Sequence, residues 1–580
     1  MDTILNDLPF TLEGISSPEI QFLDLKNVDI SADLPSSYFY PIADLTEPAL
    51  LYKQLSSFST ADSSNQTLQA LKSSISLQLQ KYLILVSVIG KQPHEKVSPS
   101  RCLIWLNDAT LALRAMKFLV DSSDSKSILN NLYELSINGD QFLANLSIDL
   151  LQSTSIPFYK WLHLWLTTGS LPDQQNDDFF IKYVENEQSF QIQKNLLPKF
   201  ISLQTAENIF QIGKTLGFVK LCNDTSFLHS CSQKIAPFSF NELPHDAQIS
   251  DYHNYVISHL SSLLNTHLKL NVHLTAMKEY LFLGRGDFVT LLIETLSPVL
   301  SRPASTLYRH SLTVALESAL RSTNCQYLPQ EIQSCLDARL LDLSHGHTGW
   351  DVFTLEYRFD SPINVVITPW CSVQYLKIFN LLWRIRRVEY ELNSSWKNST
   401  FGARSILMIP ELAQKWHPVR GAISEMICLV NQLQYYLVYE VIESSWAELQ
   451  HDLAQPPTGL DSIIQAHKRY IERIVYKGLL APESGDITAV LHSLLKQVIN
   501  FTQTITSLYS KSVSKALTPS EHTSQLQAIF DQLATIHSLF RSNLKQLLIL
   551  LNEQQHAQMR PLAIRLNYNN FYLLRKKKST

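Results

Sequence analysis

The sequence predicts a two-part, mostly α-helical protein. Its 15 glycines in 580 residues amount to 2.6%, well below the roughly 7% of average proteins. Because glycine supplies the positive backbone angles of tight turns, so low a share favours long helices joined by short connections. Apolar residues also recur at steps of three and four along many segments, as in amphipathic helices. A chain of this length exceeds one compact core, so we expect two large domains or one extended helical body.

The helical pattern is clearest between Leu68 and Ile89, where the apolar residues share one helix face. In the C-terminal half, an apolar stripe from Tyr375 to Leu392 opposes a polar face. Apolar and aromatic residues cover most faces of segment 423–449, so this helix should lie centrally in its bundle. Further helices are expected at 103–120, 128–151, 205–222, 252–282, 287–296 and 305–322, with three more after Gly459. No fixed repeat emerges at the periods of helical solenoids.

One segment has the period of a β-strand. In Val352–Phe359 the residues Phe353, Leu355, Tyr357 and Phe359 alternate with polar ones, as in a half-buried strand. Asp360-Ser361-Pro362 supplies turn chemistry, and 363–368 is rich in β-branched residues. The sequence therefore predicts one small β-hairpin in the C-terminal half, covered by helices because an isolated hairpin is only marginally stable.

Composition suggests where the chain divides. Residues 1–44 are expected to form a short irregular arm, and 45–245 an N-terminal helical-bundle domain. Periodicity fades between Asn223 and Asp251, where prolines interrupt the chain, so we place the boundary there. A C-terminal helical domain should span 246–575, followed by a basic tail at 576–580. That tail, with its run from Arg575 to Lys578, could meet an acidic surface but is expected to be solvated.

Charge and cysteine content exclude several classes of function. A net charge of −4 gives no field that demands nucleic acid. The most apolar stretch, 82–89, is far shorter than the roughly 20 residues that span a bilayer, so no membrane insertion is expected. The N-terminus lacks the layout of a signal peptide. The seven scattered cysteines favour neither a disulfide framework nor a zinc site, which indicates a reducing compartment in which the sequons at Asn393 and Asn398 stay unmodified.

Two short motifs are candidate sites of chemistry. Gly284-Arg285-Gly286 begins like a dinucleotide fingerprint, but Val289 replaces the third glycine and a helix precedes it. A helix break, with Gly284 ending one helix and Asp287 capping the next, is the better interpretation. His345-Gly346-His347 could ligate a metal with Cys335, Asp337 or Asp342, yet a solvated turn fits two histidines without paired cysteines better. We therefore expect no enzyme, no catalytic, cofactor-binding or metal-binding residues, and no cofactor.

Two aromatic clusters have two interpretations each. One surrounds Trp161 and Trp165, and the other runs from Tyr435 to Tyr439. Both are expected in the core, whereas exposed aromatic patches would mark an interface.

Several ordered segments resemble the gamma-tubulin complex component family, which includes the spindle pole body components. The resemblance is strongest in the C-terminal half, looser in the N-terminal half through Trp105, 158–161 and 212–214, and covers roughly 50–575. The chain looks most like the component 3 branch. It has almost no extension before the first helical bundle, which puts in doubt contacts made through such an extension, including those with small accessory proteins. The C-terminal segments that carry the resemblance are Thr348–Tyr357, Pro362–Thr368, Tyr375–Arg384, Arg387–Tyr390, Met277–Phe288, Arg302–Tyr308, Glu425–Met426, Gln434–Tyr436 and Ile564–Tyr572.

The resemblance implies an elongated stack of helical bundles that serves as a non-catalytic scaffold. Its N-terminal module would pack side by side with sister components, here a component 2-like chain, and its C-terminal module would hold one gamma-tubulin to template microtubule nucleation. An anchoring receptor at a spindle pole body or other microtubule-organising centre, in the cytoplasm and cytoskeleton, is the third implied partner. The rival interpretation is a generic helical-rod adaptor or tethering-complex subunit, which would co-purify with tethering subunits and not with gamma-tubulin.

Three C-terminal regions are the candidate gamma-tubulin contacts: the helix break, the segment after the next helix, and the predicted hairpin. Ordinary packing is the alternative for each, above all for Trp350 and Phe353. The candidate gamma-tubulin-binding residues are Arg285, Asp287, Arg302, Tyr308, Trp350, Phe353, Glu356 and Arg358.

Overall fold

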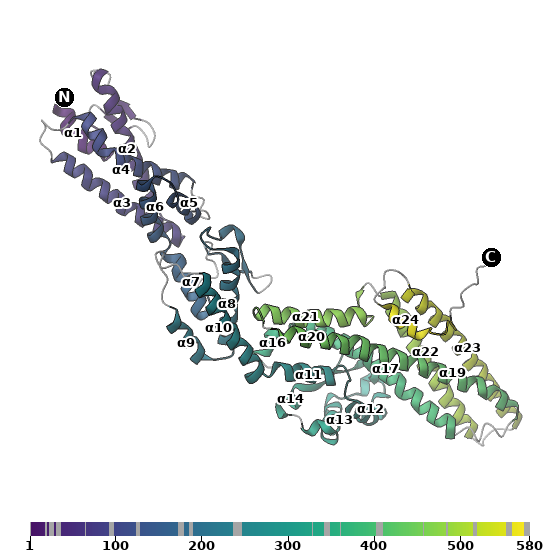
Figure 1. Ribbon diagram of the computed structural model, residues 1–580. Helices are drawn as coiled ribbons and strands as arrows, with labels where there is room; N and C mark the ends of the chain where they lie inside the picture. Colours follow the sequence, from purple (N-terminus) through teal and green to yellow (C-terminus); the bar gives the residue numbers. More distant parts are fainter. Residues whose placement is uncertain are drawn as a thin grey trace, which may run out of the picture. The chain divides into compact units, whose positions relative to one another are not determined.

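A computed structural model describes most of the chain, and Figure 1 shows its helices in sequence colours. The described chain forms two compact units, Met1–Leu260 and Ser261–Thr580. The mostly α-helical class is confirmed. The described residues are 2–17, 20–22, 28–30, 36–63, 65–91, 98–122, 128–171, 179–184, 189–235, 246–327, 329–341, 348–359, 361–401, 410–455, 457–482, 485–513, 519–552 and 559–572.

The first unit is a succession of helices with two small antiparallel strand pairs, β1–β2 and β3–β4. Its elements are α1 (Asp2–Leu12), β1 (Ile20–Phe22), β2 (Val28–Ile30), α2 (Ser36–Thr60), α3 (Gln66–Gly90), α4 (Pro99–Ser122), α5 (Ile128–Ser136), α6 (Gln141–Thr154), α7 (Ile156–Thr168), β3 (Ile181–Val184), β4 (Ser189–Ile192), η2 (Lys194–Leu196), α8 (Leu203–Leu221), α9 (Thr225–Lys234) and α10 (Asp246–Ser262), whose last two residues belong to the second unit.

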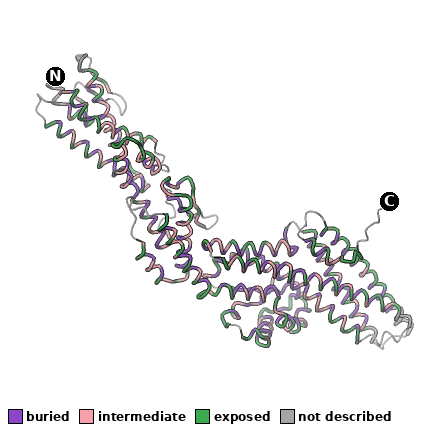
Figure 2. Tube along the Cα trace, viewed as in Figure 1, coloured by how far each residue is buried: buried purple, intermediate pink, exposed green. Residues whose placement is uncertain are grey.

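Two large hydrophobic clusters and a small one, which contains Ile20, Phe22, Ile42 and Ala49, hold the first unit together, and Figure 2 shows buried positions recurring along its helices. One large cluster joins α1 to α6 and includes the buried face of α3 predicted from the sequence. The other large cluster contains Trp161 and Trp165, so the core interpretation of that aromatic cluster is confirmed. The indole N–H of Trp165 donates to the carbonyl of Ile209 at 2.9 Å, which satisfies its buried polar atom.

The second unit is built around long helices and one two-stranded sheet. Its elements are η4 (Leu263–His267), α11 (Leu270–Tyr280), α12 (Gly286–Leu300), η5 (Ala304–Thr306), α13 (Arg309–Ser322), η6 (Asn324–Tyr327), α14 (Gln330–Cys335), β5 (Leu336–Leu340), α15 (Gly349–Val352), β6 (Phe353–Tyr357), α16 (Ile363–Val366), α17 (Pro369–Phe401), α19 (Pro410–Tyr435), η7 (Tyr436–Glu443), α20 (Ser444–Ala454), α21 (Leu460–Lys477), α22 (Gly485–Val513), α23 (Pro519–Asn552) and α24 (Arg560–Leu566).

Helix α17 is central to this unit, because it packs against α19, α21, α22 and β6. Its inner face carries Phe379 and Trp383, both almost fully buried. The apolar stripe predicted from Tyr375 to Leu392 lies on the buried side, as 3.6-residue periodicity requires.

The predicted β-hairpin needs correction in one strand. Phe353–Tyr357 does form strand β6, but its antiparallel partner is the upstream strand β5, with Leu340 opposite Phe353. The β-branched segment 363–366 is the short helix α16. In β5, the alternation of Leu336 and Ala338 with polar residues is a strand signal that the prediction overlooked.

Other boundaries also differ from those predicted. The expected irregular arm contains α1, whose Leu8 and Leu12 are buried in the first cluster, and the start of α2. The predicted single helix 128–151 is divided into α5 and α6, with Asp140 capping the second. The first unit ends at Leu260, whereas the sequence predicted a domain boundary between 245 and 246. The difference arises because α10 buries Ile249 and Val256 in the core of the first unit. The basic tail lies outside the described residues.

Candidate binding surface of the C-terminal unit

The helix break lies between α11 and α12. Leu283 has a φ of 54°, and the N–H of Arg285 donates to the carbonyl of Glu279 at 3.1 Å, which closes the turn. The extended residue Arg285, not Asp287, occupies the N-cap of α12. Asp287 lies in the first turn, where a carboxylate is stabilised by the positive end of the helix dipole. The predicted cap at Asp287 is therefore wrong by two positions, although the break itself is present.

Arg285 is already paired within the chain. Its Nε lies 2.9 Å from a carboxylate oxygen of Glu279, and this hydrogen bond raises the pKa of the guanidinium. Asp287 is exposed on the same turn. The break thus presents one acidic side chain beside a neutralised arginine.

A second group of candidates lies around the β5–β6 sheet. Glu356 pairs with Arg339 across the strands at 3.1 Å, and Arg358 pairs with Asp337 at 3.0 Å. Asp337 also pairs with Arg309, the first residue of α13. The network therefore connects the sheet to the start of α13, where Tyr308 is the N-cap residue.

The group of candidates around the β5–β6 sheet also includes Arg302 and Tyr308, and these two residues are exposed. The Tyr308 side chain is 72% exposed, and the Arg302 residue is exposed as well. The backbone carbonyl of Arg302 accepts a hydrogen bond from the N–H of Gly349 at 3.2 Å, which ties the segment after α12 to α15. We call Arg302, Tyr308, Glu356 and Arg358 the sheet-edge surface. Arg285 and Asp287 lie at the opposite end of the 15-residue helix α12, about 22 Å away along its axis, and form a separate surface.

Trp350 and Phe353 are buried, at 2% and 1% exposure. Both pack on Trp383, with ring centroids 5.6 and 5.0 Å apart. The Arg387 guanidinium lies 5.4 Å from the centre of the Trp350 ring and 3.7 Å from Asp351, and burial lowers the pKa of this arginine. Ordinary packing in the core therefore accounts for Trp350 and Phe353. Both side chains hold the sheet in place and offer no surface to a partner.

The second aromatic cluster is only partly buried, so the core interpretation is confirmed for Tyr436 but is wrong for Tyr435 and Tyr439. Tyr435 and Tyr439 are 45% and 59% exposed, while Tyr436 is buried. Their rings lie 4.8 Å apart, and the Arg565 guanidinium of α24 lies 4.4 Å from the centre of Tyr435. Tyr568 and Phe571, which follow α24, are also largely exposed. Aromatic and arginine side chains together are typical of binding interfaces.

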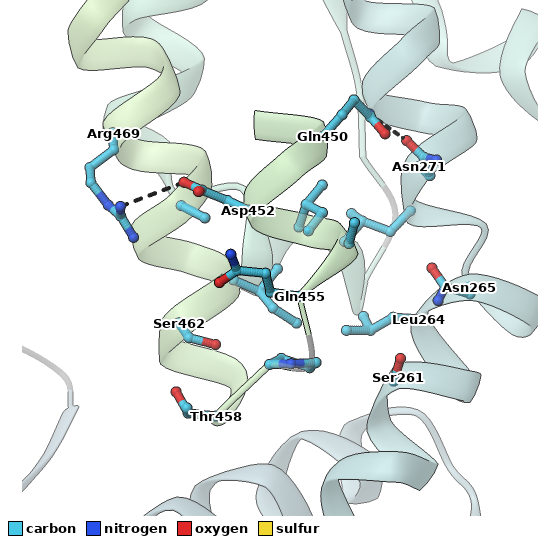
Figure 3. A pocket seen from close by; sticks show the side chains of 16 residues that line it. Ser261, Leu264, Asn265, Asn271, Gln450, Asp452, Gln455, Thr458, Ser462 and Arg469 are labelled. Atoms are coloured by element: carbon cyan, nitrogen blue, oxygen red, sulfur yellow. Dashed lines mark hydrogen bonds and ion pairs between the residues drawn. The ribbon is translucent and has the colours of Figure 1, made fainter. Parts of the chain in front are cut away.

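A polar pocket of about 510 Å³ lies between the η4–α11 region and the α20–α21 region of the same unit (Figure 3). Gln450 donates to Asn271 at 3.0 Å, and Asp452 pairs with Arg469 at 3.5 Å. No histidine, cysteine or lysine is among its described lining residues. Amides, hydroxyls and one neutralised carboxylate can bind polar groups but do not pair a nucleophile with a base.

The described residues contain no group of three His, Cys, Asp or Glu side chains placed to hold a metal ion. His345 and His347 lie outside them, while Asp337 is engaged by arginines. All seven cysteines are free thiols. In the part of the chain that the structure covers, no helix is both long and apolar enough to cross a bilayer.

The fold is that of a mostly helical structural protein, with paired charges and exposed aromatic side chains on the surface of its second unit. Two family models match in order: Gamma tubulin complex component N-terminal over residues 5–267 and Gamma tubulin complex component C-terminal over 270–572. The chain belongs to the gamma-tubulin complex component family, whose members are structural components of that complex.

Known relatives agree with this assignment. The chain is 36% identical to spindle pole body component alp6 of Schizosaccharomyces pombe, over 98% of this chain and 75% of the relative. It is 28% identical to the gamma-tubulin complex component 3 homolog of Xenopus laevis, over 99% and 71%. It is 22% identical to mouse gamma-tubulin complex component 2, over 86% and 60%. Similarity to the component 3 and spindle pole body members is thus confirmed.

Proposed function

We propose that this chain is a scaffold subunit that binds gamma-tubulin through its second unit and packs side by side with sister components through its first. The observation that carries the proposal is the coincidence of two divisions. The N- and C-terminal family models meet between residues 267 and 270, close to the point where the two compact units meet after Leu260. Each family module therefore corresponds to a unit with its own core, as a division of labour requires.

Such a scaffold promotes nucleation through effective concentration. Free tubulins lose translational and rotational freedom when they join a ring, and that loss opposes assembly. In a row of scaffold chains that each hold one gamma-tubulin, the gamma-tubulins have already lost this freedom before tubulin arrives. No bond-making chemistry is needed, so the proposed role is not enzymatic. Names such as spindle pole body component among the relatives support a location at a microtubule-organising centre and an anchoring receptor there.

Within the second unit, the sheet-edge surface is the proposed gamma-tubulin contact. Arg302 and Tyr308 are its exposed members, and Glu356 and Arg358 are its members held in ion pairs with Arg339 and Asp337. Arg285 and Asp287 form a secondary contact at the other end of α12. Trp350 and Phe353 act through the position of β6, because both are buried.

Two fragments test the division of labour. A cut at 245/250 would remove α10 from the core of the first unit, so fragments 1–260 and 261–580 are the better pair. We expect fragment 261–580 to retain gamma-tubulin in a pull-down and 1–260 to retain a component 2-like sister chain. Recovery of gamma-tubulin by 1–260 alone would reverse the assignment. Recovery of membrane-tethering subunits in place of gamma-tubulin by the full chain would favour the rod-adaptor interpretation.

A further inference from the structure

The segment between α12 and α13 (Figure 1) carries an exposed serine three residues after an exposed arginine. The serine, Ser305, lies in the short turn η5, and the arginine is Arg302. Among the described residues, neither side chain forms a hydrogen bond or an ion pair. The hydroxyl of the neighbouring Thr306, by contrast, donates to the carbonyl of Pro303 at 2.8 Å. Within the described part of the chain, Ser305 therefore presents an unengaged hydroxyl close in sequence to an unpaired cation.

The same spacing occurs only once more in the whole sequence. Across the 580 residues, an arginine stands three positions before a serine or threonine at Arg302–Ser305 and at Arg358–Ser361. Both arginines belong to the sheet-edge surface. Arg358, however, pairs with Asp337 at 3.0 Å, and an aspartate directly precedes Ser361 in the sequence. The second serine thus follows an arginine that carboxylates already neutralise, whereas the first follows an arginine without such a partner in the described chain.

The backbone around Ser305 has to change little to enter a kinase cleft. Phosphoryl transfer requires the hydroxyl in line with the γ-phosphate of ATP, so the turn has to open there. Pro303 and Leu307 already have extended ψ values of 142° and 131°. Between them, the N–H of Thr306 donates to the carbonyl of Pro303 at 3.0 Å, and that of Leu307 to the carbonyl of Ala304 at 3.2 Å. Opening these two bonds frees the buried side chains of Ala304 and Leu307 but leaves α12 and α13 intact.

We propose that Ser305 is a phosphorylation site for an arginine-directed protein kinase, and that its phosphate releases gamma-tubulin from the sheet-edge surface. Kinases select their substrates through charge patterns such as this one. The Ser305 hydroxyl oxygen forms a bond to the γ-phosphorus of ATP, and the bond from that phosphorus to the oxygen of the departing ADP breaks. The hydroxyl proton passes to the catalytic aspartate of the kinase. The release of gamma-tubulin rests on the proposed function, whereas the modification itself does not.

Phosphate reverses the charge that this part of the surface offers. A partner that fits the unpaired guanidinium of Arg302 presents a negative group to it. Phosphoserine carries about −1.5 to −2 charges near neutral pH, and its oxygens match the fork of an arginine side chain. Phosphorylated Ser305 therefore occupies Arg302 and adds net negative charge three residues before Tyr308, so the negative group of the partner is repelled.

The first experiment locates the phosphate without gamma-tubulin. The full-length chain is incubated with Mg-ATP and an activated calmodulin-dependent protein kinase, which is arginine-directed, and its peptides are analysed by mass spectrometry. We expect phosphate at Ser305, with incorporation at least about tenfold slower at Ser361 and in the Arg302→Ala variant, since both lack an available cation. The chain purified from growing cells should carry phosphate at Ser305 as well. Equal incorporation at Ser361, or no phosphate at Ser305 in either the treated or the cellular chain, overturns the proposal.

The second experiment measures equilibrium binding of purified gamma-tubulin to the full-length chain before and after phosphorylation. Phosphorylation should weaken binding at least about tenfold, because repulsion replaces attraction at Arg302. Ser305→Asp should weaken it in the same direction but less, since a carboxylate carries a smaller charge. Ser318→Asp, at an exposed serine of α13, is the matched control and should bind normally.

The two experiments separate this inference from the proposed function. A phosphorylated chain that binds gamma-tubulin as tightly as the unmodified chain disproves release and leaves the gamma-tubulin assignment standing. Equal weakening by Ser305→Asp and Ser318→Asp disproves a local effect at Arg302. If the unmodified chain binds no gamma-tubulin, the proposed function and the release fall together, while the mass spectrometry still decides whether Ser305 is the modified residue.

Discussion

Gly349 lies directly against Leu300, the last residue of α12. A Cβ atom at Gly349 would stand 2.9 Å from both the Cα and the carbonyl oxygen of Leu300, and 2.7 Å from Cδ1 of Leu307. Real Cβ atoms do not approach backbone that closely, so only glycine fits at the start of α15. This approach places the Arg302 carbonyl within reach of the Gly349 N–H and fixes the sheet-edge surface to the end of α12.

The first prediction follows from that contact. Gly349→Ala should lower the free energy of unfolding by about 1–3 kcal/mol, because backbone atoms must move to admit the methyl group. Gly286→Ala is the matched control, since a Cβ there meets nothing within 4 Å. Urea unfolding of both variants measures the difference. Equal stabilities for the two would show that the α12–α15 approach is not as tight as described.

The second prediction concerns acid sensitivity. His467 is 1% exposed, its Nε2 lies 3.0 Å from the Tyr375 hydroxyl, and burial lowers its pKa from 6.5 to about 4. The folded state holds the neutral ring, whereas the unfolded chain takes up a proton below pH 6.5. Stability contributed by neutral His467 is therefore complete above pH 6.5 and is lost as the pH falls toward 4, by about 3 kcal/mol in total.

The pH dependence can be assigned to that side chain by substitution. His467→Leu should flatten the fall in unfolding free energy between pH 6.5 and 4, whatever its effect at neutral pH. His310→Leu on α13, where the histidine is exposed, should leave the slope unchanged. Denaturant unfolding at several pH values measures both. A slope unaltered in the His467 variant would contradict a buried neutral ring.

The third prediction concerns the end of the chain. Glu425 accepts from His537 at 2.9 Å and Arg541 at 2.9 Å, and it also contacts Tyr572. Burial raises the Glu425 pKa, but these hydrogen bonds outweigh it and bring the pKa to about 2. Glu425→Gln should cost about 1.5–3 kcal/mol, as expected for hydrogen bonds to a charged group. It should also speed hydrogen exchange in 559–572.

A surface ion pair provides the contrast for this variant. Glu448→Gln removes the partner of Arg473, where both side chains are substantially exposed, and should cost less than about 1 kcal/mol. Exchange in 559–572 should not change in this control. If Glu425→Gln behaves like Glu448→Gln, the Glu425 carboxylate does not hold segment 559–572 in place.

Low glycine content and apolar periodicity together predicted the helical class, and periodicity predicted most helices, because the buried face of α3 or α17 recurs every three to four residues. Periodicity could not predict whether Tyr435 and Tyr439 are buried or exposed. The chain changes to a π-helix at Tyr436–Glu443, where five-residue hydrogen bonding rotates the faces away from a 3.6-residue pattern. An aromatic run that looks apolar on every face therefore gave no sign of which tyrosines would be exposed.

The candidate site was partly predictable for a similar reason. Motif resemblance marked the sheet-edge surface, but alternation in Phe353–Tyr357 does not reveal whether one face of a strand is open. Here both faces are covered, so even Thr354 is buried and its hydroxyl donates to the Arg339 carbonyl at 3.2 Å. The partner strand of β6 was not predicted because the 12 residues 341–352 separate β5 from β6. The turn residues after β6 indicated instead a partner strand that follows it closely in the sequence.

The last prediction concerns the proposed gamma-tubulin contact. Tyr308→Ser on the 261–580 fragment should weaken gamma-tubulin binding about five- to thirtyfold, as for an exposed aromatic side chain at an interface centre. Stability should not change, because the Tyr308 side chain is 72% exposed. Val314→Ser on the same helix, where the valine is 59% exposed, is the matched control and should bind normally. Equilibrium binding with purified gamma-tubulin measures both. If Tyr308→Ser binds like the parent while Tyr435→Ser/Tyr439→Ser does not, the contact belongs to the exposed tyrosines beside α24 and not to the sheet-edge surface.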